Sequence, residues 1–325
     1  MARGSLQRTH GPPLPASLLE EAARANAYAG AARSLATLRA YNSDWALFTA
    51  FCDARGLDPL PASPAAAATF AAHEADRGIN PRTIMRRISA IGHFHRQAGA
   101  VVPGAQPGGA RLTEVLAGIR RTHGKPKQRK APAAAKVIAA MLGSIAGDDR
   151  RSRRDRAILA LGMAAALRRS ELAALQVADV ALVPQGLDLA IRRSKTDQEG
   201  KGAVIAVPEG LRLRPKALLL DWLSAAAIDD GPLFRRLTRA GAVTGDPMSD
   251  RAVARLVKRA AADAGYDPAL FGGHSLRAGF LTEAAANGAT IFKMQDVSRH
   301  KSVQVLSDYV RAAERYEDHA GAGFL

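Results

Sequence analysis

Two polar–proline pairs, Ser63-Pro64 and Asn80-Pro81, constrain the fold of this 325-residue chain more than any other feature. In each pair the first side chain can cap a helix, and the proline fits the first helical turn, where no amide donor is needed. The spacing of apolar residues indicates further helices on both sides of these two. The sequence therefore predicts an all-helical first half, with helices over about 34–54, 64–76, 81–97 and 111–121.

The second half has a different pattern. Three short apolar runs, 179–182, 187–192 and 203–207, are separated by turn residues and predict a small antiparallel sheet. Around the sheet we expect helices at about 133–145, 153–166, 170–175, 216–226, 250–264, 276–287, 291–298 and 302–313. The expected fold class is mainly α, with an all-helical domain over 1–122, a basic linker over 123–132, and an α+β domain over 133–325.

Charge and composition limit the possible functions. The formal net charge of +16 makes a polyanion such as nucleic acid the expected partner. The single cysteine, Cys52, excludes an intrachain disulfide framework and a zinc site built on cysteines. We find no apolar run long enough for a membrane span and no secretory signal, so we expect a cytoplasmic, nucleoid-associated protein of bacterial type.

The second half also carries polar residues suited to phosphate chemistry, in a definite order. Arg168 and Glu171 lie in Leu-Arg-Arg-Ser-Glu-Leu at a helix start, and Lys195 lies in Ser-Lys-Thr at a turn between two expected strands. A His-x-x-Arg element follows, then a second histidine, and a tyrosine nine residues later: His274, Arg277, His300 and Tyr309. Each piece alone is weak, but the ordered set is specific.

This ordered set resembles that of the tyrosine recombinases, also called the phage integrase family, and the resemblance runs from about Ser34 to Tyr309. It implies an enzyme that cuts and rejoins DNA at specific sites through a 3′-phosphotyrosyl intermediate and a Holliday junction. Tyr309 would be the nucleophile, and Lys195 the general acid that protonates the leaving 5′ oxygen. The covalent intermediate conserves bond energy, so we expect no cofactor, neither ATP nor metal.

Elementary chemistry supports these roles. The transition state of phosphoryl transfer places extra negative charge on the nonbridging oxygens, and fixed cationic donors stabilise that charge. Arg168 and Arg277 would form this clamp because a guanidinium can bind two phosphate oxygens and stays charged. His274 and His300 would add donors. Glu171 resembles the family's acidic residue that holds a histidine or arginine of the site in place.

Several neighbouring residues compete with these assignments. Arg169 competes with Arg168, Lys201 with Lys195, and Tyr316 with Tyr309, and in each case the family pattern favours the second residue of the pair. The chain departs from that pattern at two positions that are usually glycine, Ala166 and Arg299. Both changes could alter the loop backbone, and we expect Arg299 to add a phosphate contact.

The first half resembles the core-binding domain of Cre-like members of the family. By that resemblance Arg82, Thr83 and Arg86 would face the major groove of double-stranded DNA from one helix. Arg120 and Arg121 would meet phosphates at the start of the linker. The alternative is that these are solvated surface residues. By the same resemblance, the two domains would close around the DNA recombination site as a clamp.

Assembly and function leave alternatives open. Recombination of two duplexes implies a homo-tetramer on DNA, although the free protein is expected to be monomeric. The terminal Phe324-Leu325 pair could dock into a neighbouring protomer, or the tail could simply be frayed. A tyrosine-type topoisomerase and a DNA-binding protein without chemistry are the competing functions. The intact catalytic set argues against the second of these.

Overall fold

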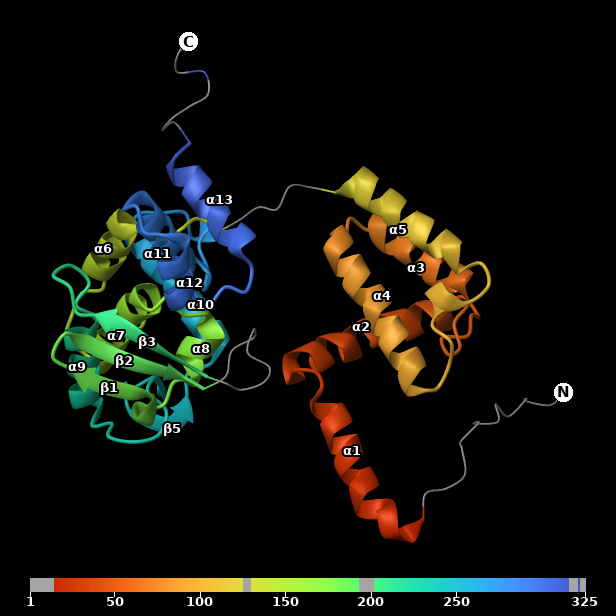
Figure 1. Cartoon of the computed structure of the whole chain (residues 1–325), viewed down its shortest axis with the longest axis horizontal. Helices are drawn as coiled ribbons and strands as arrows, with labels where there is room; N and C mark the ends of the chain where they lie inside the picture. The colour runs from red at the N-terminus through yellow and green to blue at the C-terminus, as the bar shows by residue number, and fades with distance from the viewer. Residues whose placement is uncertain (1–14, 125–129, 193–201, 316–320, 322–325) are drawn as a thin grey trace. The chain divides into compact units, whose positions relative to one another are not determined.

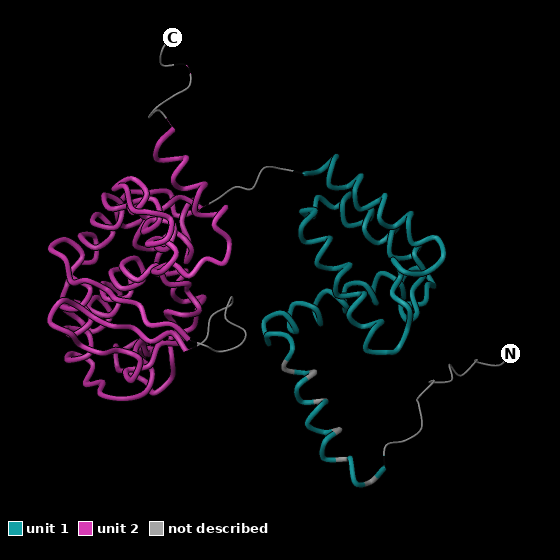
Figure 2. The backbone as a smooth tube through the Cα atoms, in the orientation of Figure 1, with its two compact units in different colours: residues 1–127 teal, residues 128–325 magenta. Residues whose placement is uncertain are grey.

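The computed structural model describes residues 15–124, 130–192, 202–315 and 321, and divides the chain into two compact units, 1–127 and 128–325 (Figure 2). The expected fold class is confirmed, because both units are mainly helical and the strands form small antiparallel sheets. No helix in these ranges is long and apolar enough to cross a bilayer.

The first unit is entirely helical over its described residues (Figure 1). Its helix starts use the caps that the sequence suggests: Ser63 Oγ accepts from the Ala66 amide at 3.1 Å, and Asn80 Oδ1 accepts from the Arg82 amide at 2.9 Å. Its elements are η1 (Ala16–Leu18), α1 (Leu19–Ala31), α2 (Leu35–Asp53), α3 (Pro64–Asp76), α4 (Pro81–Gln97), η2 (Pro103–Ala105) and α5 (Gly109–His123).

Apolar side chains hold these helices together in two clusters. Phe48 and Phe51 of α2 pack edge-on against Phe70 of α3, with ring centroids 5.2 Å apart in both pairs. Ile84 of α4 and Leu112 of α5 lie in the other cluster, which contains the alanines of α3. Cys52 is buried within the first cluster, as its apolar surroundings suggest.

The second unit combines helices with two small antiparallel sheets, β1-β2-β3 and β4-β5 (Figure 1). The helices are α6 (Ala135–Ser144), α7 (Arg150–Ala164), α8 (Arg169–Ala174), α9 (Pro215–Ala226), α10 (Asp250–Asp263), α11 (Ser275–Ala286), α12 (Ile291–Ser298) and α13 (Val303–Ala313), with 3-10 turns η3 (Val177–Asp179) and η4 (Pro268–Leu270). The strands are β1 (Val180–Val183), β2 (Gly186–Ile191), β3 (Ala203–Pro208), β4 (Arg235–Leu237) and β5 (Val243–Pro247).

Helix α7 lies at the centre of this unit, and its residues Ile158, Leu159 and Leu161 are fully buried. The three-stranded sheet contributes alternate residues to the same core, with Leu189 of β2 paired to Ile205 of β3. Gly162 lets α11 approach α7 closely, because a Cβ at this position would lie 2.7 Å from Leu276 Cδ1. This close approach brings α11 beside the end of α7, where the candidate site begins.

Candidate active site

The corner between α7 and α8 positions the first candidate arginine. Helix α7 ends in a Schellman motif, in which the Leu167 amide donates to Gly162 O at 3.1 Å and the Ala166 amide to Met163 O at 2.9 Å. This motif requires a left-handed residue, and Ala166 takes that conformation with φ of 47°. The turn exposes Arg168 at the N-terminus of α8. Ala166 therefore adopts the geometry of the glycine that it replaces, at some cost in strain.

Glu171 anchors Arg168 in two ways. Its Oε1 accepts from Arg168 Nη1 at 2.6 Å, and its Oε2 accepts from the Arg168 backbone amide at 2.8 Å. The carboxylate is almost fully buried, with 2% of its side chain exposed, whereas 16% of the Arg168 side chain is exposed. The arrangement fits the expected holding role of Glu171, with Arg168 as the residue it holds.

Arg299 is a second partner of Glu171. Its Nη2 donates to Glu171 Oε2 at 2.7 Å and its Nη1 to Val297 O at 2.7 Å. Only 11% of the side chain is exposed. We expected Arg299 to contact a phosphate, but the structure shows a buried ion pair with Glu171. Burial alone would raise the pKa of Glu171, but the charge of Arg299 and the charge and hydrogen bonds of Arg168 hold it below its usual range.

Arg277, on the first turn of α11, is buried at 1% exposure. Its Nη1 donates to Ala166 O at 2.6 Å, its Nη2 donates to Ser298 O, and Nη2 also lies 3.2 Å from His300 Nδ1. Burial and the neighbouring charge of Arg168 lower its pKa to about 9, so the guanidinium stays protonated at neutral pH. Its charge is therefore present in the site, although the side chain is covered.

His300 follows α12 and is held from two sides. Ser298 Oγ lies 2.9 Å from its Nδ1, and Gln295 Nε2 donates to its backbone oxygen at 2.8 Å. Burial and the charges of Arg277 and Arg168 lower the pKa of His300 to about 4. The ring is therefore neutral at physiological pH, so it can act as a hydrogen-bond donor or acceptor and not as a cation.

Tyr309 and His274 complete the group. Tyr309 lies on α13 beside the cluster of Leu281, Met294 and Leu306, and it is close enough to Arg277 to influence its pKa. His274 is exposed just before α11, and its charge influences the pKa of His300. The second unit thus brings six of its seven predicted catalytic residues into one electrostatically coupled group.

The seventh, Lys195, lies outside the described residues, as do the competing residues Lys201 and Tyr316. The connection from β2 to β3 contains Lys195, as the sequence suggests. Arg169, the competitor of Arg168, is half-exposed and its Nε lies 3.1 Å from Asp250 Oδ2. It is thus directed to α10, whereas Arg168 is held by Glu171.

The predicted DNA-facing residues of the first unit lie on two helices. Arg82 and Thr83 lie at the start of α4, where Arg82 is exposed, and Arg120 and Arg121 are exposed at the end of α5. Arg86 differs from these, because its Nε and Nη2 donate to the two carboxylate oxygens of buried Asp44 at 2.8 and 2.9 Å. Half of its side chain remains exposed, but its charge is already paired.

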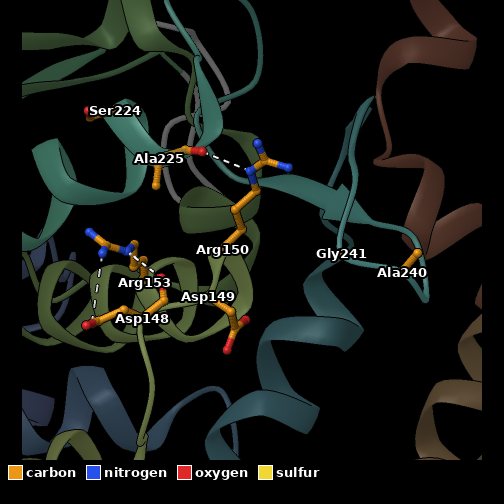
Figure 3. Close-up of a pocket in the computed structure, with 8 residues that line it drawn as sticks. All are labelled: Asp148, Asp149, Arg150, Arg153, Ser224, Ala225, Ala240 and Gly241. Carbon is orange, nitrogen blue, oxygen red and sulfur yellow. Dashed lines mark hydrogen bonds and ion pairs between the residues drawn. The ribbon is translucent and has the colours of Figure 1, made fainter.

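Other features of the second unit are separate from this group. A cavity of about 510 Å³ is lined by two aspartates and two arginines among its eight residues, and Figure 3 shows Arg150 bonded to the Ala225 carbonyl and Arg153 to Asp148. None of the predicted site residues lines it. Across the described part of the chain, no three His, Cys, Asp or Glu side chains gather as a metal site would require.

Sequence reasoning missed Ser298 and gave Arg299 a different role, that of a phosphate contact. Ser298 gave no signal, since a serine before a basic residue has no distinctive pattern. Arg299 stood out only as a departure from glycine, and its φ of 55° explains why glycine would suit the position. Its partner Glu171 lies 128 residues away in sequence, so the pairing was not visible there.

Comparison with known proteins gives consistent matches. The model of the phage integrase family matches residues 134–315, and that of the phage integrase N-terminal SAM-like domain matches residues 29–100. An integrase/recombinase XerD homolog from Selenomonas ruminantium is 34% identical over 286 residues, covering 87% of this chain and 84% of the relative. Tyrosine recombinase XerD from Xanthomonas axonopodis pv. citri (strain 306) is 30% identical over 282 residues, covering 86% and 88%.

Solved structures share the fold. The XerH site-specific recombinase in a post-cleavage complex with a palindromic difH substrate matches with a TM-score of 0.61 and 16% identity, over 80% of this chain and 72% of that one. A lambda integrase (75–356) dimer bound to a COC′ core site matches with a TM-score of 0.58 and 18% identity, over 93% and 97%. At these identities the likeness establishes the architecture alone.

Proposed function

The chain belongs to the phage integrase family of tyrosine recombinases, enzymes of site-specific recombination that break and rejoin DNA, and from this premise we propose that Tyr309 is its nucleophile. The observation that carries the assignment is the group around Arg277. Tyr309 is close enough to influence the pKa of Arg277, and Arg277 in turn lies 3.2 Å from the neutral His300 and beside the charge of Arg168. Fixed positive charge and hydrogen-bond donors are what a pentacovalent phosphate needs.

The reaction follows from these side chains. The Tyr309 hydroxyl gives its proton to water and its oxygen attacks the phosphorus, so a 3′-phosphotyrosyl bond forms and the bond to the 5′ oxygen breaks. Lys195, by the family resemblance, gives a proton to that leaving oxygen. The free 5′ hydroxyl of a partner strand then attacks the phosphotyrosyl bond, which restores the tyrosine and joins the exchanged strand. A second such exchange resolves the Holliday junction.

The arginines play different parts in this proposal. Arg168, partly exposed, and the exposed His274 would contact the nonbridging oxygens of the scissile phosphate. Arg277 is covered by the protein, so it would act mainly through its charge and by its contact with His300. His300, being neutral, would donate one N–H while its other ring nitrogen faces Ser298.

Double-stranded DNA is the partner in this proposal, and two solved proteins of the same fold are bound to a palindromic difH substrate and to a COC′ core site. The exposed basic residues Arg82, Arg120 and Arg121 would contact it from the first unit, and Thr83 would lie beside them. Arg86 would contact DNA chiefly through the exposed half of its side chain. Two duplexes bound by two protomers each would make the working assembly a homo-tetramer, with the tail beyond the described residues as its candidate link.

The test uses a nicked suicide substrate that traps the covalent intermediate. Wild-type protein should form an adduct at Tyr309 in excess EDTA, since every proposed charge stabiliser is a side chain. Tyr309→Phe removes only the attacking oxygen, so it should bind the same DNA with unchanged affinity and form no adduct. An adduct in the Phe variant would overturn the assignment of the nucleophile. A wild-type reaction that stops in EDTA and returns with Mg²⁺ would overturn the metal-free mechanism.

A further inference from the structure

Arg299 occupies a backbone position that suits glycine better than arginine. Its φ of 55° and ψ of 41° lie in the left-handed region, which a residue with a Cβ adopts only at a cost in energy. Despite this conformation, its side chain turns inward and is 11% exposed. A strained residue whose long, charged side chain is buried requires a compensating interaction.

That interaction is with Glu171. The two carboxylate oxygens divide their partners: Oε1 takes the guanidinium of Arg168 at 2.6 Å, and Oε2 takes the guanidinium of Arg299 at 2.7 Å. With a single arginine partner, a buried carboxylate would offset the whole positive charge of that arginine, and the pair would have no net charge. With two arginine partners, the carboxylate is balanced while positive charge remains on the pair.

Arg299 also contacts Arg168 through its main chain. Its carbonyl oxygen lies 3.4 Å from Arg168 Nη2, so the side chain of Arg299 holds the anchor of Arg168 while its backbone touches Arg168 itself. Its own Nη1 and Nη2 are engaged with Val297 O and Glu171. The guanidinium is therefore engaged by the protein itself and largely shielded from solvent.

We propose that Arg299 is a positioning residue of the recombination reaction: it shares the Glu171 carboxylate with Arg168, and so keeps Arg168 oriented toward the scissile phosphate while the three groups together carry a net positive charge. This inference rests on the proposed function, because it gives Arg299 a role only if Arg168 meets the phosphate. It differs from a DNA-contacting role for Arg299, which the sequence alone suggested.

The test compares Arg299→Gln with Arg299→Lys, in the full-length protein. The glutamine keeps a side chain of similar length without charge, and the lysine restores charge without the planar fork. Single-turnover adduct formation on the suicide substrate is followed from pH 5 to 9, and half-site binding is titrated separately. Arg153→Gln is the matched control, since it removes a different partly buried arginine–carboxylate pair of the same unit, that with Asp221.

We expect Arg299→Gln to bind the half-site within about threefold of wild type but to cleave roughly 10- to 100-fold more slowly at pH 7, the usual effect of losing a supporting contact. Without the Arg299 charge the Glu171 carboxylate protonates at higher pH, so the acid limb of the profile should move upward. Arg299→Lys should move the limb back toward wild type. The control should leave the limb unchanged.

A double variant separates positioning from general damage. Glu171→Gln combined with Arg299→Gln should cleave no more slowly than Glu171→Gln alone, because both changes break one chain of contacts. If Arg299→Gln does not fold, Arg299→Gly, which suits the left-handed backbone, replaces it throughout.

Two results would overturn the proposal. The first is a wild-type cleavage rate and pH profile in Arg299→Gln. The second is a loss of half-site affinity as large as the loss of cleavage, because that result would mean that Arg299 contacts DNA directly. Failure of the wild-type protein to form any adduct at Tyr309 would instead overturn the proposed function.

Discussion

Ala166 joins two structural roles in one small residue. Its left-handed backbone ends α7, and its carbonyl oxygen, turned by that conformation, accepts a hydrogen bond from Arg277. The methyl group contributes to neither role, since both belong to the main chain. Glycine would meet both requirements without the clash that a Cβ creates in this region.

Ala166→Gly should therefore raise the stability of the protein slightly. The left-handed conformation costs an alanine about 1–2 kcal/mol, and the buried methyl returns about 0.8 kcal/mol. We expect a net gain of about 0.5 kcal/mol in the free energy of unfolding, measured by urea denaturation. Ala165→Gly is the control: Ala165 is equally buried but has φ of −96°, so this change should destabilise the protein. Equal losses in both variants would contradict the argument.

His95 is the second residue with a measurable consequence. It is fully buried in α4, with the Ala62 amide donating to its Nε2 at 2.8 Å and its Nδ1 2.8 Å from Ile91 O. Together these bonds require the neutral ring with its proton on Nδ1. Burial lowers the pKa of His95, against a smaller opposing effect of the bond to Ile91 O.

Because the pKa of His95 is lowered in the folded protein, acid should destabilise the fold. Below about pH 6.5 the unfolded histidine binds a proton and the folded one does not, so stability falls as the pH falls below that value. One such group contributes at most about 1.4 kcal/mol per pH unit. The free energy of unfolding should drop between pH 7 and pH 5, with His93 and His300, whose pKa values are also lowered, adding to the slope. His95→Gln should reduce that slope, and an unchanged slope would exclude His95 as a source.

At the scale of elements, an ion-pair network ties three helices of the first unit. Arg87 of α4 pairs with Glu74 of α3 and, at 3.7 Å, with Asp44 of α2, and both carboxylates are nearly fully buried. Arg77 pairs with Glu74 from the surface, with 57% of its side chain exposed. Arg87 is thus the buried counter-charge that the two carboxylates share, while Arg86 and Arg77 pair with them from more exposed positions.

Arg87→Leu should destabilise the protein by up to about 3–5 kcal/mol, because it leaves the buried Glu74 and Asp44 with only their more exposed partners Arg77 and Arg86. Arg77→Ala removes a partner of the same Glu74 but from an exposed position, and should cost less than about 1 kcal/mol. Both values come from urea denaturation at neutral pH. Similar costs for the two variants would mean that burial does not set the strength of this network.

The sequence predicts most of these elements because each carries its own local signal. The cap-and-proline pairs place α3 and α4, and the apolar run with turn residues places β2. Helix α1 was missed because Leu19–Ala31 is rich in alanine and charge and has no clear apolar stripe. The β4-β5 hairpin was missed because its short strands are polar and joined with an irregular register.

Contacts between distant segments explain what the sequence could not supply at the site. The candidate catalytic set could be proposed from the sequence because the order of its residues along the chain is distinctive. The pairing of Arg86 with Asp44, 42 residues earlier, was not, and it changes how much of the Arg86 charge is available to DNA. Long-range pairs of this kind depend on how helices pack, which local patterns do not encode.

At the scale of the whole molecule, the net charge of +16 sets how binding depends on salt. A protein that contacts about six to ten phosphates releases a comparable number of counterions, and its affinity falls about 10³- to 10⁵-fold between 50 and 200 mM salt. We expect this protein to fall within that range when its binding to duplex DNA is titrated at several salt concentrations. A nearly flat salt dependence would contradict DNA binding through many phosphate contacts.

Each of the two arginines of the candidate site contacts a main-chain carbonyl at the end of a helix that is distant from it in the sequence. Arg277 of α11 binds the carbonyl at the end of α7, while Arg168 at the start of α8 lies against the carbonyl at the end of α12. Arg277 cannot take its place until the turn between α7 and α8 has formed, and Arg168 cannot take its place until the end of α12 has formed. A second unit that has folded only in part therefore lacks at least one of these two arginines in its place. The candidate site is complete only when all of these elements have packed together.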